Sequence, residues 1–142
     1  HKDRTMDRFL NTETDPNLLS PLDLAFLGDC VYELFVREKL VTEANRPNRD
    51  LHAAKVKLVN ANAQEAAIKT LLPHLTEKEA SVFRRGRNAH TNHTPKNMSS
   101  ASYHAATGCE ALFGYLYLNG ELDRLREFFE IIYNGQEEHS SI

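Results

Sequence analysis

Two carboxylates stand out in this sequence because each lies in a helix-like stretch that is mostly apolar. Asp29 follows Gly28 in LAFLGDCVYELFV, residues 24–36, and Glu110 is the only acid in SYHAATGCEALFGYLYL, residues 102–118. Removing a carboxylate from water is costly unless a cation or a hydrogen-bond donor compensates it. If the two acids face one another, they repel unless a cation lies between them, and oxygen ligands of this kind suit Mg²⁺ or Mn²⁺.

A simpler explanation of the same acids stays open at this point. Lone acids on buried helices often pair with a basic residue from elsewhere, and 17 lysines and arginines are available. Cys30 and Cys109 stand far apart and form neither a disulfide framework nor a zinc pattern. No Ser-His or Cys-His arrangement indicates a side-chain nucleophile. The acids therefore predict either a site for a divalent metal ion or a helical interaction domain with salt-bridged carboxylates.

A basic segment lies between the two acids. The whole chain has a formal net charge of −3, which argues against a protein whose entire surface binds nucleic acid. Residues 80–109 nevertheless contain no Asp or Glu, while they contain three arginines, Lys96 and three histidines. This local excess predicts an anion-binding site, although a solvated loop that lacks acids by chance would have the same composition.

The sequence marks the ends of the helices that must position these residues. SPLD at residues 20–23 and TEKE at residues 76–79 are capping boxes that begin helices. Asn48 can cap another helix, and Asn60 marks a break between two helical stretches. The sequence predicts a single all-α domain without strands, with helices over residues 21–40, 48–59, 60–72, 76–87, 101–118 and 121–133.

The helix that carries Asp29 has apolar side chains on more than one side. Phe26 makes the Asp29 side apolar, which predicts that the helix is buried from a second direction. Gly28 has no side chain and would let another helix approach beside the acid. The main stripe, which we expect to face the core, contains Leu24, Leu27, Val31, Leu34 and Phe35.

A length of 142 residues corresponds to one domain with its own core. We expect residues 1–17 to be partly disordered or extraneous to the fold, residues 18–135 to form the domain, and residues 136–142 to form a tail. No apolar run approaches the roughly 20 residues that span a bilayer, and no signal-peptide pattern is present. These features favour a cytoplasmic protein that does not bind membranes.

Several segments resemble the ribonuclease III family. FLGDCVYELFV, residues 26–36, is similar to the family's signature helix, and GCEALFGYLYLNG, residues 108–120, is similar to its second acidic segment. HAAKVKLVNANAQEAA, residues 52–67, resembles the helices between them. RGRNAHTNHTPKN, residues 85–97, narrows the resemblance to the short Mini-ribonuclease III branch, which lacks an appended double-stranded-RNA-binding domain. The resemblance covers residues 18–133.

The resemblance implies a homodimeric endonuclease that hydrolyses double-stranded RNA with Mg²⁺, or with Mn²⁺ as a substitute. It also implies a role in maturing the large-subunit (23S) ribosomal RNA precursor. Asp29 and Glu110 match the family's catalytic metal ligands, but Ala25 and Thr107 replace two further family acids. We therefore expect weaker metal binding with more water around the ion. A ribonuclease III-like protein that binds structured RNA without cleaving it is the alternative.

The basic segment then becomes the predicted RNA surface. A-form RNA is recognised mainly through its shape, its phosphates and its 2′-hydroxyl groups. Lys55 is a weaker candidate from the preceding helices, and such contacts predict an affinity that falls steeply with salt. We expect the main contacts from Arg85, Arg87, Asn88, Lys96 and Asn97.

Overall fold

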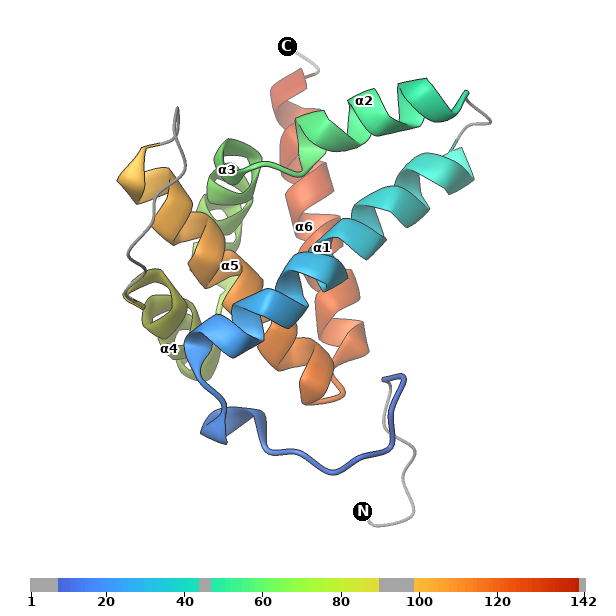
Figure 1. The fold of residues 1–142 in the computed structure, drawn as a ribbon. Coiled ribbons are helices and arrows are strands. Elements are labelled where there is room, and N and C mark those ends of the chain that lie inside the picture. The colour runs from blue at the N-terminus through green and yellow to red at the C-terminus, as the bar shows by residue number, and fades with distance from the viewer. Residues whose placement is uncertain (1–7, 44–46, 90–98, 141–142) are drawn as a thin grey trace.

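The computed structural model of this chain describes residues 8–43, 47–89 and 99–140, and in the last helix it describes side chains as far as residue 134. Within these ranges the chain forms six α-helices and two short 3-10 helices, and no strand (Figure 1). The predicted all-α class is confirmed. The elements are η1 (Pro16–Leu18), α1 (Pro21–Glu43), α2 (Asn48–Leu58), α3 (Ala61–Leu71), η2 (Leu72–His74), α4 (Glu77–Arg87), α5 (Ser100–Leu118) and α6 (Leu122–Ser140).

Helix α5 occupies the middle of the fold, because α1, α3 and α4 all pack against it (Figure 1). Residues 105–116 of α5 are all buried except Glu110, which is partly exposed. Helix α6 adds Leu125, Phe128 and Ile132 to the same core. Burial of these apolar side chains is the main favourable contribution to folding. A single carboxyl group therefore interrupts a segment that is otherwise removed from water.

Several helix ends form as the sequence predicts. The hydroxyl of Thr76 accepts a hydrogen bond from the N–H of Glu79 at 3.1 Å, and the carboxylate of Glu79 accepts one from the N–H of Thr76 at 2.9 Å. Asn60 separates α2 from α3 and caps α3 by accepting from the N–H of Ala63 at 2.8 Å. Gly120 adopts a φ of 72°, which ends α5 and turns the chain toward α6. Each of these signals depends only on neighbouring residues, and each forms the predicted helix end in the folded chain.

Three local expectations are wrong. Pro47, not Asn48, is the N-cap of α2, and no side chain caps this helix. Helix α6 does not stop at Gly135 but continues to Ser140, because one glycine costs a helix only about 1 kcal/mol and the glutamine and glutamates that follow favour helix. Leu34, assigned to the core stripe of α1, is 53% exposed. The buried side of α1 is thus rotated from the predicted stripe.

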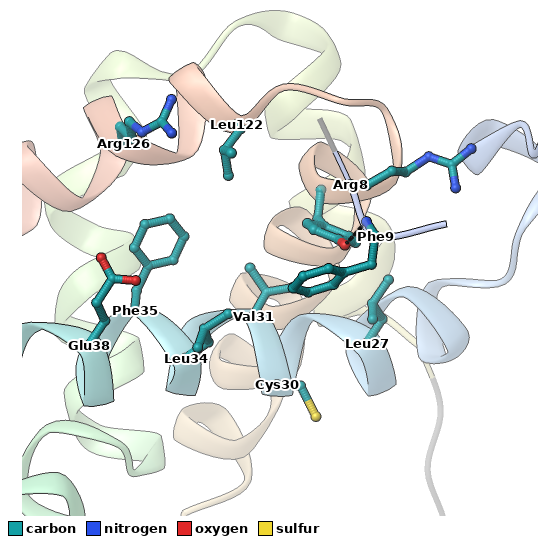
Figure 2. A pocket seen from close by; sticks show the side chains of 11 residues that line it. Arg8, Phe9, Leu27, Cys30, Val31, Leu34, Phe35, Glu38, Leu122 and Arg126 are labelled. Carbon is teal, nitrogen blue, oxygen red and sulfur yellow. Dashed lines mark hydrogen bonds between the residues drawn. The ribbon is translucent and has the colours of Figure 1, made fainter. Parts of the chain in front are cut away.

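Helix α1 has an apolar side that the described part of the chain leaves uncovered. Phe26 is 84% exposed and Val41 is 62% exposed, so the described residues do not provide the expected second direction of burial. A groove of about 670 Å³ lies next to Leu34, between α1 and the start of α6 (Figure 2). Phe9 of the N-terminal segment lines this groove, and its N–H donates to the hydroxyl of Tyr117 at 2.7 Å.

Among the described helices, none has the length and apolarity that crossing a bilayer would require.

Candidate active site

Asp29 and Glu110 come together where α1 crosses α5. A Cβ atom added to Gly28 would lie 1.6 Å from the backbone oxygen of Glu110, and one added to Gly114 would lie 2.0 Å from the backbone oxygen of Leu24. No side chain fits at either position, so the two backbones are in direct contact. The expectation that Gly28 admits another helix beside the acid is confirmed, and that helix carries the second acid.

The two carboxyl groups differ in exposure. Asp29 is exposed in the described chain, whereas Glu110 is partly buried between helices. Burial and the negative charge of Asp29 raise the pKa of Glu110 to about 8, and a hydrogen bond between the two carboxyl groups adds to the shift. The acids therefore face one another, which is the arrangement that the sequence left open. The costly burial falls on Glu110, however, and not on Asp29.

A third polar side chain reaches the acids from α3. Gln64 is 4% exposed, and its Nε2 donates a hydrogen bond of 3.1 Å to Oε2 of Glu110. This bond favours the carboxylate and so opposes the rise that burial causes in the pKa of Glu110. Sequence reasoning missed Gln64. The available signal was its place on the buried face of α3, which otherwise consists of Ala61, Ala67, Ile68 and Leu71.

Other acids near the pair do not complete a larger cluster. Glu33, one turn after Asp29, forms an ion pair of 2.7 Å with Arg37. Thr107, for which the resemblance implies an acid in other family members, donates its hydroxyl to the carbonyl of Tyr103 at 3.0 Å. Across residues 8–43, 47–89 and 99–140, no three His, Cys, Asp or Glu side chains are grouped to hold a metal ion. A metal here would have two carboxylate ligands and would complete its shell largely with water.

The pair nevertheless fits a hard divalent cation. None of the ion pairs between described residues involves Asp29 or Glu110, so the salt-bridge explanation finds no partner in that part of the chain. Two facing carboxyl groups, one of them partly buried, cannot both ionise cheaply without a nearby positive charge. An ion with oxygen ligands would remove this repulsion, which is the arrangement that Mg²⁺ and Mn²⁺ prefer.

The predicted RNA-binding residues do not all lie together. Gly86, near the end of α4, packs against Gly108 of α5, so this end of α4 is fixed to the central helix. Lys55 lies on α2, on the opposite side of the molecule from α4 (Figure 1). Lys96 and Asn97 lie outside the described residues. The exposed end of α4 carries the other three, Arg85, Arg87 and Asn88.

Comparison with known proteins decides the family. The family model of the Ribonuclease III domain matches residues 22–121, which include both acids. This chain belongs to the ribonuclease III family. It is 49% identical over 113 residues to the Mini-ribonuclease 3 of Thermoanaerobacter sp. (strain X514), covering 80% of each chain. It is 48% identical over 116 residues to the Mini-ribonuclease 3 of Symbiobacterium thermophilum, covering 82% of this chain and 89% of that one.

A solved structure has the same fold as this chain. The crystal structure of a protein from Fusobacterium nucleatum matches this fold with a TM-score of 0.78 and 28% sequence identity, covering 90% of this chain and 98% of that one. The resemblance to Mini-ribonuclease III is confirmed by the family model and by the sequence relatives. The chain is a ribonuclease III-type endoribonuclease.

Proposed function

We propose that this protein is a homodimeric, Mg²⁺-dependent endoribonuclease that cleaves double-stranded RNA in the cytoplasm. The observation that carries the proposal is the pair of facing carboxyl groups, Asp29 and Glu110, at the crossing of α1 and α5. We take the large-subunit ribosomal RNA precursor as its substrate, on the resemblance of the sequence to the Mini-ribonuclease III branch.

The two acids would hold the ion, with Mn²⁺ as a possible substitute, and they contribute differently. Asp29 is exposed and accessible to RNA and water, while Glu110 is fixed by α5 and by the hydrogen bond from Gln64. A divalent ion, when bound, supplies a more acidic water for attack on the phosphodiester and positive charge for the leaving oxygen. The protein's own contribution is to keep two carboxylates at a fixed separation on rigid helices. No side-chain nucleophile is required.

The charge on α4 supports RNA as the substrate. Arg84, Arg85 and Arg87 lie in the last turn of this helix and are exposed. Guanidinium groups bind phosphate oxygens through paired hydrogen bonds, and such contacts supply most of the sequence-independent affinity for nucleic acid. Arg87 also lies over the ring of Phe83, 5.5 Å from its centroid, which favours one position of its charge. RNA contacts stay predictions for every residue assigned to this surface, including Lys55 and, beyond the described residues, Lys96 and Asn97.

The uncovered apolar side of α1 supports the homodimer. Leu22, Phe26, Leu34 and Val41 are all exposed on this helix, and monomeric proteins rarely leave large apolar patches open to water. In a two-fold dimer the same surface of each copy would cover the other. The dimer would also double the basic ends of α4 and provide two acid pairs, one for each RNA strand.

Cleavage of a long double-stranded RNA tests the proposed activity. The wild type is expected to cut this RNA with Mg²⁺, whereas Asp29→Asn is expected to bind it but to cut at least about 100-fold more slowly, because one ligand charge is lost. Asp23→Asn is the matched control, because Asp23 is an exposed acid in the first turn of the same helix. Equal cutting by wild type and Asp29→Asn would contradict the assigned role of Asp29.

A second candidate function is RNA binding without cleavage. The replacement of two family acids by Ala25 and Thr107 favours it, because less negative charge is available to hold metal. Binding without cutting by the wild type, across a broad range of Mg²⁺ and Mn²⁺, would establish this alternative. RNA affinity measured from low to high salt is expected to fall steeply in either case, and an affinity independent of salt would contradict the proposed RNA surface.

A further inference from the structure

Gln64 has no assigned part in the chemistry, although it is buried beside the acid pair. Its side chain is 4% exposed, on a face of α3 whose other buried residues are apolar. A primary amide removed from water costs free energy unless it makes hydrogen bonds, and a leucine would fill similar space without that cost. The bond that Gln64 makes is directed at Oε2 of Glu110, at 3.1 Å.

We propose that Gln64 is a positioning residue that orients the Glu110 carboxylate for a divalent ion and replaces part of what the two absent acids would do. This inference rests on the proposed function, because it takes Asp29 and Glu110 as the residues that hold the ion. The three side chains come from three different helices, since α1 and α3 each pack against α5. Gln64 therefore fixes one oxygen of Glu110 from a direction that neither α1 nor α5 supplies.

A neutral donor suits this position better than another carboxylate would. Glu110 already faces Asp29, and a third negative charge nearby would increase the repulsion when no ion is bound. An amide N–H adds no charge, and the hydrogen bond that it donates stabilises the ionised form of the carboxylate that accepts it. At the two positions where the family has acids, Ala25 is buried and apolar, and the hydroxyl of Thr107 is bonded within its own helix. Among the described side chains, Gln64 is therefore the one that still holds in place an oxygen of a proposed metal ligand, Oε2 of Glu110.

The decisive experiment compares two variants that each remove one hydrogen bond between α3 and α5. Gln64→Met keeps a long side chain of similar volume and removes the bond to Glu110. Ser102→Ala removes a bond of 2.7 Å between Ser102 of α5 and Glu65 of α3, and Ser102 is also buried. Mn²⁺ affinity is measured without RNA, from the paramagnetic resonance signal of the free ion, and kcat and KM are measured with double-stranded RNA.

Gln64→Met is expected to weaken Mn²⁺ binding by about tenfold or more, the effect typical of residues that orient metal ligands. We expect kcat to fall while KM for RNA stays unchanged. Ser102→Ala should lose comparable thermal stability and keep wild-type Mn²⁺ affinity. Wild-type Mn²⁺ affinity in folded Gln64→Met would overturn the inference.

If Gln64→Met does not fold, Gln64→Asn replaces it in the same measurements. Asparagine keeps the amide but is one methylene shorter, so the donor is withdrawn from Glu110 and the same loss of Mn²⁺ affinity is expected.

Asp29→Asn separates the two proposals. Full Mn²⁺ affinity in Asp29→Asn would overturn the proposed metal site itself, whereas loss in Asp29→Asn without loss in either Gln64 variant would overturn only the role of Gln64.

Discussion

Glu110 combines two requirements that conflict at the level of a single residue. It lies within the buried part of α5, and it faces a second carboxyl group. Without a cation, this environment favours its protonated form, although holding a cation requires the ionised form. The hydrogen bond from Gln64 reduces the conflict without removing it. A bound cation would therefore compensate the free energy that burial of the ionised carboxylate still costs.

The pH dependence of stability tests this conflict. The pKa of Glu110 rises from 4.5 to about 8 in the folded, metal-free chain, through burial first and then the charge of Asp29. Between these values the folded state binds more protons than the unfolded state, so the free energy of unfolding should fall as the pH rises from about 4.5 to about 8. The expected loss is on the order of a few kcal/mol. Chemical denaturation in the presence of a chelator measures it.

Glu110→Gln supplies the control for this measurement, because an amide does not titrate in this range. The variant should lose most of the downward slope between pH 4.5 and 8. Addition of Mg²⁺ at pH 8 should stabilise the wild type and leave Glu110→Gln nearly unchanged. A wild-type stability that rises over this pH range would show that Glu110 is ionised without difficulty.

At the level of elements, the crossing of α1 and α5 determines the separation of the acids. Gly28 and Gly114 bring the two backbones together, so Asp29 and Glu110 are held by main chain and not by flexible side chains. Helices that touch in this way cannot separate or slide without losing contacts along their length. The precision of the site therefore comes from two positions that have no side chain.

Gly28→Ala should be strongly destabilising for this reason. The added methyl group would lie 1.6 Å from the backbone oxygen of Glu110, and backbone cannot move aside as a side chain can. We expect a loss of at least about 3 kcal/mol in the free energy of unfolding, measured by urea denaturation. Gly120→Ala, which only strains a turn at a φ of 72°, should cost about 1 kcal/mol. Equal losses in the two variants would contradict the close crossing.

The elements also show which features the sequence could predict. The capping box at Thr76, the break at Asn60 and the turn at Gly120 depend on neighbouring residues, and all three form as expected. The end of α6 was predicted wrongly because Gly135 is a strong stop signal only when the following residues do not favour helix. The position of Gln64 against Glu110 depends on how α3 packs on α5, which no local pattern in the sequence contains.

At the level of the whole molecule, the exposed apolar side of α1 predicts association. Phe26 is 84% exposed, so Phe26→Glu should change little within one copy of the chain. In a dimer that covers this residue, a buried charge without a partner is strongly unfavourable. We expect the wild type to be a dimer and Phe26→Glu to be a folded monomer, measured by light scattering at micromolar concentration. A monomeric wild type would contradict the homodimer.

The same surface explains why sequence reasoning misjudged α1. The helical spacing of apolar residues makes each of them a candidate for the core of one chain. It therefore predicts that Leu34 is in the core, although this side chain is exposed. This spacing does not distinguish side chains that pack within the chain from side chains that the chain leaves exposed. The apolar neighbours of Asp29 likewise predict more burial than it has, since Asp29 is exposed in the described chain. The identity of both acids was predictable, whereas their environments depend on tertiary packing.

The division of the acid pair between α1 and α5 also bears on how the protein is made. The ribosome synthesises Asp29 early and Glu110 late, with α2, α3 and α4 between them. A growing chain that ends before α5 contains one of the two acids and lacks the helix against which α1 packs. If the protein cleaves RNA through this pair, as proposed, cleavage cannot begin until α5 has emerged from the ribosome and packed against α1.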